Sequence, residues 1–205
     1  MKNPVIRDTD VLAFTDYFRM TAELDEVLDY FGVECESNWA ELPSSARALP
    51  YLDSLRERLE ETLLHVSLTS EAARREVLIA PVVVDLVRYV GGRLRIEYPV
   101  DAGPQLHGSL DYLLQVERSL LVIEAKNADL ARGMTQLAVE LLAVDQLASE
   151  TAQPLLYGSI STGTTWQIAC FDRHQRRFIQ NLRVFNVPGD LEALLRTLVG
   201  CVADS

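Results

Sequence analysis

The stretch LHGSLDYLLQVERSLLVIEAK, residues 106–126, decides the fold of this chain. Two runs rich in Leu, Ile, Val and Tyr flank a polar pair at 117–118, so they predict a β-hairpin that turns at this pair. In that register, Asp111 stands directly opposite Glu124. Because side chains alternate along a strand, Lys126 shares a face with both carboxylates. The hairpin is therefore expected to end in three charged groups.

This arrangement predicts a metal site. Carboxylates that face each other on neighbouring strands repel, and burial raises the cost of leaving them unpaired. Oxygen ligands suit Mg²⁺ or Mn²⁺, so the expected ligands are Asp111, Glu124 and the backbone carbonyl of Ala125. A bound metal ion polarises a phosphate and activates water, while Lys126 orients that water or offsets the developing charge. These groups suit phosphodiester hydrolysis.

Outward from the hairpin, the apolar pattern predicts an α/β fold. A helix is expected from Thr69 or Ser70 to the Gly91-Gly92 pair, and Pro81 is expected to kink or split it. The hairpin strands and a preceding strand over 93–100 are predicted to form an antiparallel meander. Apolar spacing predicts a helix over 130–148. The later segments are strands over 154–162, 164–172 and 176–185 and a helix over 190–200.

Residues 1–68 are predicted to be an acidic helical extension, and residues 69–205 the core with its C-terminal helix. Helices are expected over 9–32 and 51–66, with a loop between them. Residues 1–70 hold 14 acids against 6 bases, a net −8, whereas residues 71–205 hold 16 against 13, a net −3. We expect the N-terminal helices to contact a second copy of the chain or a partner subunit.

Composition narrows the class of protein. The chain has 205 residues, 48% of them hydrophobic, which suits one domain with or without an extension. It contains no apolar run long enough to span a membrane and no secretory signal pattern, so a cytoplasmic protein without a membrane partner is expected. Its three cysteines lack CxxC spacing, which argues against zinc and disulfides. The net charge of −11 argues against a protein that coats nucleic acid.

The hairpin also carries a resemblance to a known family. Leu110-Asp111 and the later Glu124-Ala125-Lys126, which follows the apolar run LLVI, resemble the split motif of the PD-(D/E)xK, or restriction-endonuclease-like, superfamily. Leu110 stands where that motif usually has proline. The resemblance implies a restriction-endonuclease-like α-β-β-β-α-β core with a mixed central sheet flanked by helices. It also implies a magnesium-dependent hydrolase, a nuclease, with DNA as its partner.

The resemblance extends over roughly residues 69–187. SEAARREVLIAPVVVDLV is similar to the first core helix in the N-terminal nuclease domains of type I restriction enzyme R subunits, where Glu71 matches a glutamate that often completes the metal site. Gln136 is similar to a glutamine on the helix after the lysine that approaches the active site, although Glu140 replaces the tyrosine often found four residues on. The resemblance thus adds Glu71 as a metal ligand and Gln136 as a site residue.

Each of these assignments has an alternative. Asp111, Glu124 and Lys126 could form a solvated strand end with a cross-strand salt bridge. Glu71 could be a first-turn acid favoured by the helix dipole, with Glu76 as a rival on the same helix. A glutamine on an apolar helix face is commonly the partner of a backbone group. The alternative function is a catalytically silent nuclease-fold module that acts in protein or nucleic-acid interaction.

Overall fold

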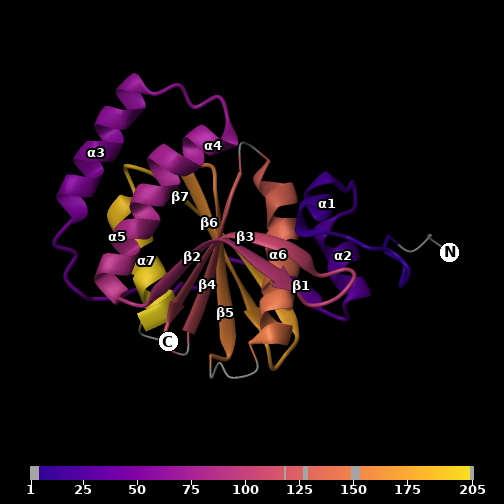
Figure 1. The fold of residues 1–205 in the computed structure, drawn as a ribbon. Coiled ribbons are helices and arrows are strands. Elements are labelled where there is room, and N and C mark those ends of the chain that lie inside the picture. Colours follow the sequence, from indigo (N-terminus) through magenta and orange to yellow (C-terminus); the bar gives the residue numbers. More distant parts are fainter. Residues whose placement is uncertain (1–4, 118, 127–128, 149–152, 204–205) are drawn as a thin grey trace.

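A seven-stranded sheet lies between two layers of helices in a computed structural model that describes residues 5–117, 119–126, 129–148 and 153–203 (Figure 1). The strands are β1 (Glu34–Asn38), β2 (Arg93–Asp101), β3 (His107–Val116), β4 (Ser119–Ala125), β5 (Leu155–Ser161), β6 (Thr165–Asp172) and β7 (Arg177–Asn186). The helices are α1 (Phe14–Arg19), α2 (Leu24–Tyr30), α3 (Leu52–His65), α4 (Glu71–Arg74), the π-helical turn η1 (Arg75–Ile79), α5 (Ala80–Val90), α6 (Leu130–Leu147) and α7 (Leu191–Ala203).

The sheet is mixed, with the strand order β1-β7-β6-β5-β4-β3-β2. Strands β2, β3 and β4 form the predicted antiparallel meander. Strand β5 runs parallel to β4, because α6 carries the chain back across the sheet between them. The expectation of an α/β protein with a mixed sheet flanked by helices is confirmed.

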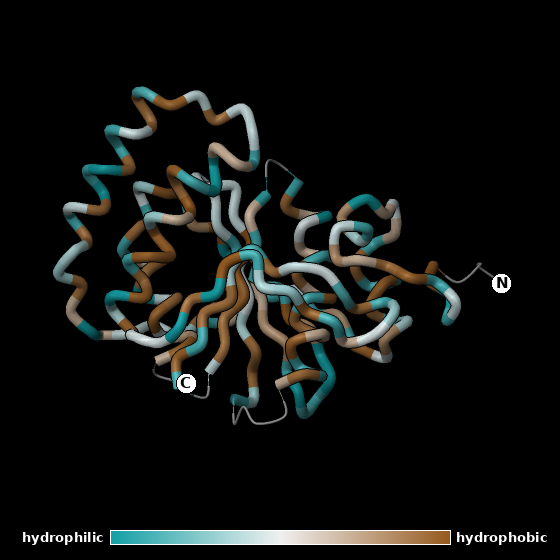
Figure 2. Tube along the Cα trace, viewed as in Figure 1, coloured by the Kyte–Doolittle hydropathy of each residue, from teal (hydrophilic) through white to brown (hydrophobic). Residues whose placement is uncertain are grey.

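Two hydrophobic cores lie on opposite faces of the sheet. Helices α1, α2 and α6 cover one face, and α3, α5 and α7 cover the other (Figure 1). Strand β4 is buried on both faces, which explains its continuous apolar run LLVI. Figure 2 shows hydrophobic residues along the central strands and on the helices that pack against them. The hairpin that carries Glu124 therefore lies in the middle of the molecule.

The helical segment before the meander accommodates Pro81 by forming a wider, π-helical turn just before it. Pro81 has no N–H to donate, and its ring would collide with the carbonyl group of Val77 four residues earlier. The chain forms the π-helical turn η1 just before this point, and the N–H of Ala80 donates to the carbonyl of Arg75. The prediction of a kink or a split is thereby resolved as a π-helical turn between α4 and α5. The extra residue in this turn also changes the direction of the side chains that precede it.

The N-terminal region differs from the prediction. The helix expected over 9–32 consists of two short helices, α1 and α2, and the segment expected to be a loop contains β1. Strand β1 pairs in parallel with β7, which lies more than 140 residues later, and forms one edge of the sheet. Its sequence, ECESN, lacks the apolar alternation of a half-buried strand, so only this long-range pairing identifies it. The description of residues 1–68 as a helical extension is therefore wrong for residues 34–38.

Candidate functional site

The β3–β4 hairpin has the predicted register. It pairs Tyr112 with Ile123 and Val116 with Ser119. The next pair in this register is Asp111 with Glu124, at the end of the hairpin far from its turn. The Oδ2 atom of Asp111 accepts a hydrogen bond from the backbone N–H of Ala125 at 2.9 Å. The Asp111 carboxylate thus contacts the backbone next to Glu124, and its charge acts on the Glu124 carboxyl group.

Glu124, Lys126, Gln136 and Glu140 form a buried polar cluster between β4 and α6. Their exposed fractions are 3%, 5%, 2% and 0%, which excludes a solvated strand end for Glu124 and Lys126. The Lys126 ammonium forms an ion pair with Oε1 of Glu124. Nε2 of Gln136 donates to Oε1 of Glu124 at 2.6 Å and to Oε1 of Glu140 at 2.8 Å. Gln136 thus links two buried carboxylates.

The pKa values of the ionisable groups in this cluster differ from their ordinary values. Burial and, to a smaller extent, the Asp111 charge raise the pKa of Glu124 to about 7, against the opposing charge of Lys126. Burial raises the pKa of Glu140 well above its ordinary value, and the Glu124 charge adds to this effect. Burial alone would lower the pKa of Lys126, but the charge of Glu124 and its hydrogen bond outweigh burial, so this pKa is raised. The site therefore favours a proton or an additional cation beside an ionised Lys126.

Three acceptor atoms in the cluster have no hydrogen-bond partner among the described residues: Oε2 of Glu124, Oε1 of Gln136 and Oε2 of Glu140. A buried carboxylate oxygen without a donor costs about 1–3 kcal/mol or more. Of these three atoms, Oε2 of Glu124 belongs to the residue that directly precedes Ala125 and that the register places opposite Asp111. Its chemistry suits a hard cation held by oxygen ligands.

Glu140→Gln is expected to stabilise the metal-free protein at pH 8, because the amide supplies a donor and removes a buried charge. The gain should be roughly 1–3 kcal/mol, the usual cost of an unsatisfied buried polar group. The folded state raises the pKa of Glu140 above its ordinary 4.5, so the native protein holds a proton that the unfolded chain releases. Stability from this group is therefore present below about pH 4.5 and is lost as pH rises toward the folded pKa.

Urea denaturation of the native chain and Glu140→Gln from pH 4 to pH 8 measures this effect. The two free energies of unfolding should be similar at the acidic end and should separate as pH rises. A constant difference across the whole range would contradict the protonation argument.

Asp111 is held by a cation from the other helical layer. Nη1 of Arg75, the first residue of η1, donates to Oδ1 of Asp111 at 3.1 Å. The same nitrogen forms an ion pair with Glu97 on β2. Asp111 therefore faces Arg75 and Glu97, whereas Glu124 faces Lys126 and α6.

The predicted ligand Glu71 is an exposed residue in the first turn of α4, where Ser70 caps the helix by accepting from the N–H of Ala73 at 3.0 Å. Its charge is one of those that raise the pKa of Lys126. Glu76 is also exposed and lies 3.9 Å from the Arg75 guanidinium. Within the described ranges, no group of three or more His, Cys, Asp or Glu residues has a metal-binding arrangement. A metal site here would therefore rely on two carboxylates, a backbone carbonyl and water.

Arg75, Glu97 and Glu140 also take part in this arrangement. The sequence singled out neither Arg75 nor Glu97, and it drew attention to Glu140 only as the replacement of a tyrosine. Glu140 could have been found, because it lies four residues after Gln136 and shares its helix face. Arg75 and Glu97 carried no such signal, since their approach to Asp111 depends on η1 and on the pairing of β2 with β3.

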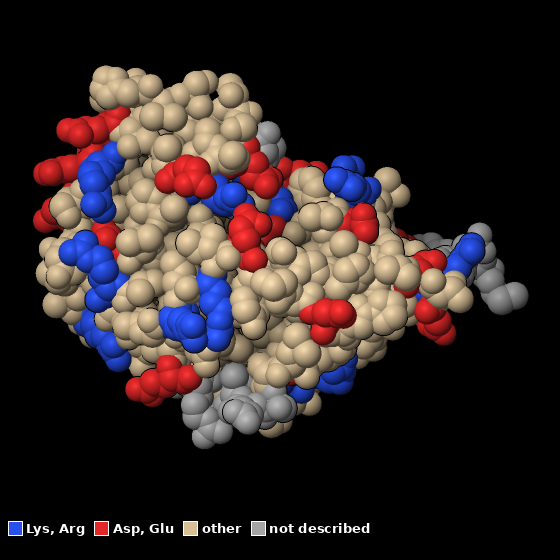
Figure 3. All heavy atoms as spheres, in the orientation of Figure 1, with Lys and Arg blue, Asp and Glu red and all other residues tan. Residues whose placement is uncertain are grey.

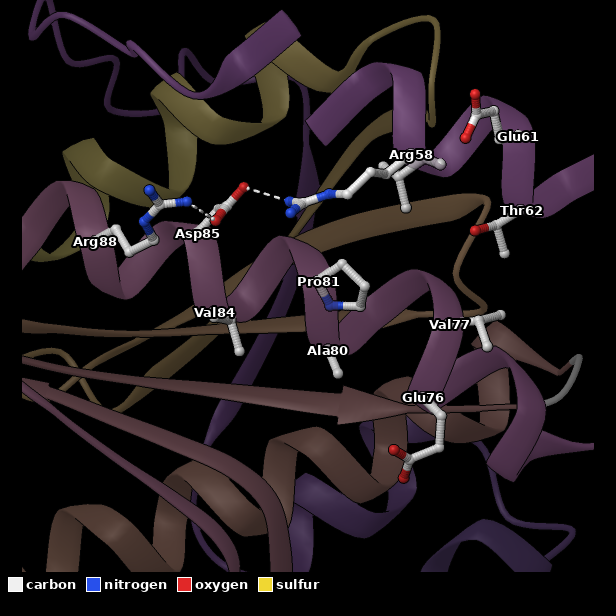
Figure 4. Close-up of a pocket in the computed structure, with 11 residues that line it drawn as sticks. Arg58, Glu61, Thr62, Glu76, Val77, Ala80, Pro81, Val84, Asp85 and Arg88 are labelled. Carbon is white, nitrogen blue, oxygen red and sulfur yellow. Dashed lines mark hydrogen bonds and ion pairs between the residues drawn. The ribbon is translucent and has the colours of Figure 1, made fainter. Parts of the chain in front are cut away.

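A separate groove of about 620 Å³ lies between α3 and the η1–α5 segment, and none of Asp111, Glu124 and Lys126 lines it (Figure 4). Asp85 is buried at its side and is held by Arg58 at 2.9 Å and by Arg88 at 2.9 Å. The Arg88 guanidinium also lies 3.4 Å from the centre of the Tyr51 ring. These contacts fasten α3 to α5, so the charged groups at this groove are accounted for by packing.

The sequence matches no protein-family model and none of the curated proteins compared with it. Within the part of the chain that the structure describes, no helix has the length and apolar character needed to cross a membrane.

Proposed function

We propose that this protein is a metal-dependent nuclease of the PD-(D/E)xK type that hydrolyses phosphodiester bonds of DNA. The observation that carries the proposal is the buried Glu124–Lys126 ion pair, which leaves Oε2 of Glu124 without a partner among the described residues and stands beside Asp111 at the end of one hairpin. Burial of a lysine and a carboxylate costs desolvation free energy that their ion pair can fail to recover, so such a pair is weak evidence for a purely stabilising role. Perturbed groups of this kind cluster at functional sites.

The order of elements supports the same proposal. The core runs α5-β2-β3-β4-α6-β5, with three antiparallel strands followed by a helix and a strand parallel to β4. This order of elements agrees with the α-β-β-β-α-β order that the resemblance implies and so supports the proposal. In that resemblance, Asp111 on β3 and Glu124 on β4 are the two acidic motif residues.

The residues present fit Mg²⁺ or Mn²⁺. Asp111, Glu124 and the Ala125 carbonyl would hold the ion, and water would complete its ligands, as is usual for Mg²⁺. The ion supplies Lewis-acid polarisation of the phosphate and a more acidic bound water. Glu71 stays a prediction as a further metal ligand; its side chain is exposed, and its charge is among those that raise the pKa of Lys126.

The chain's own groups have distinct roles in this proposal. The Lys126 ammonium donates a hydrogen bond to the attacking water or to a phosphate oxygen and offsets charge that develops during the reaction. Gln136 positions Glu124 by donating to it at 2.6 Å. The ring of Phe18 on α1 lies 5.3 Å from the Lys126 nitrogen and limits the directions open to it.

A DNA partner needs local positive charge in this acidic chain. Figure 3 shows basic side chains over α5 and the start of β2, while acidic side chains gather over α3. Arg93 and Arg95 lie on β2, the edge strand next to β3. Such a region would hold the phosphate backbone while the motif residues act on one bond.

Cleavage of labelled single- and double-stranded DNA with Mg²⁺ or Mn²⁺ tests the proposal, with Asp111→Asn as the paired variant. We expect the native chain to cut DNA and to melt at a higher temperature with the metal, because a ligand of the folded state stabilises it. Asp111→Asn should lose both effects. Absence of cleavage together with absence of a metal-induced shift in Tm would favour the silent nuclease-fold module, a reading that the Arg75 contact to Asp111 also favours.

A further inference from the structure

Arg75 lies where a cation is required by two carboxylates on neighbouring strands. Its Nη1 atom donates to Oδ1 of Asp111 at 3.1 Å and pairs with Oε1 of Glu97. The remaining oxygen of Asp111 accepts the Ala125 N–H at 2.9 Å. A single guanidinium nitrogen therefore neutralises the side of Asp111 that points away from Ala125.

Two unusual backbone features place these groups. Arg75 begins the π-helical turn η1, a feature that occurs often at functional sites. Glu97 has a φ of +51°, a left-handed conformation that is strained for a residue with a side chain. The β2–β3 ladder pairs Ile96 with Tyr112 and Tyr98 with Leu110 but skips Glu97 and Asp111. The pairing of β2 with β3 is thus missing at the position where Glu97 reaches Arg75, although β2 itself continues to Asp101.

We propose that the gap between Asp111 and Glu97 is a second cation position of the site and that the Arg75 guanidinium permanently fills it. This inference rests on the proposed function. It assigns two positive groups to the reaction centre: one metal ion, held by Asp111, Glu124 and Ala125, and the Arg75 guanidinium. Each carboxylate oxygen has two lone pairs, so Asp111 can bridge both positions. Arg75 then supplies, without a second metal ion, positive charge on the far side of Asp111.

The arrangement has a direct consequence for metal stoichiometry. Removal of the guanidinium leaves two adjacent carboxylates that repel each other, and a divalent ion with water ligands relieves this repulsion. The native chain should therefore bind one Mn²⁺ ion, and Arg75→Ala should bind two. The double variant Arg75→Ala/Glu97→Gln should return to one, because it removes a carboxylate from the second position only.

Calorimetric titration with Mn²⁺ alone, without DNA, measures these numbers, and circular dichroism establishes that each variant is folded. Arg75→Gln, which keeps a polar but shorter and uncharged side chain, serves as a second neutral variant should Arg75→Ala fail to fold. Arg56→Ala removes an arginine of α3 that pairs with Asp53 at 3.3 Å, and it should bind one ion like the native chain.

The outcomes separate this inference from the proposed function. One ion in both the native chain and the neutral Arg75 variants would overturn the second position and leave the nuclease proposal standing. Two ions in the native chain would show that Arg75 does not fill the position. If Arg75→Ala bound one ion while the native chain and Arg75→Ala/Glu97→Gln bound none, the second position would be supported and the native metal site would be contradicted. Absence of binding in every folded variant would overturn both.

Discussion

Lys126→Ala is expected to lower the rate of DNA cleavage by about 10²–10³-fold, the usual loss when one donor to a developing charge is removed. The effect should fall mainly on kcat, because the ammonium is buried beside Glu124 and acts on the reacting group more than on the rest of the substrate. Single-turnover cleavage of labelled DNA with saturating Mn²⁺ measures it. Arg56→Ala, which removes the same charge from α3, should cleave at the native rate.

The same substitution leaves Glu124 buried without its cation, so folding has to be measured beside activity. Lys126→Arg keeps the positive charge next to Glu124 but cannot place a single nitrogen in the same way. It should therefore restore most of the melting temperature while cleavage stays well below the native rate. Recovery of full cleavage in Lys126→Arg would mean that Lys126 only balances the charge of Glu124.

Gln136→Leu is expected to lower the free energy of unfolding by about 2–4 kcal/mol at pH 8. The amide nitrogen donates to Glu124 and to Glu140, at 2.6 and 2.8 Å, and hydrogen bonds to charged groups contribute about 1.5–3 kcal/mol each. The loss should be smaller at pH 5, where burial keeps both carboxyl groups protonated, in line with their raised pKa values. Urea denaturation at the two pH values measures the difference.

Gln146→Leu is the matched control, because Gln146 is an exposed glutamine on the same helix. Its effect should stay within about 0.5 kcal/mol, as is usual for surface substitutions. An equal loss at pH 5 and pH 8 in Gln136→Leu would assign the effect to packing and not to the two carboxylates.

The contrast between Glu124 and Asp111 shows how far local patterns reach. Strand alternation and the position of the turn were enough to predict the hairpin register, which the pairs from Tyr112–Ile123 to Val116–Ser119 follow. They were also enough to place Lys126 beside Glu124, because the two residues are separated by one position on the same strand face. The partners supplied by other segments, Arg75 for Asp111 and Glu97 for Arg75, needed the packed structure.

The sequence by itself determined the α/β class, the meander and the β3–β4 register, because these depend on the alternation of apolar and polar residues over short distances. Only the tertiary structure decided that β1 joins the sheet beside β7, that the chain passes Pro81 through a π-helical turn, and that Arg75 reaches Asp111. These features depend on contacts between residues that are far apart along the chain. Their free energies depend on desolvation and charge pairing in the folded interior. The spacing of apolar residues along the chain does not reveal these contributions.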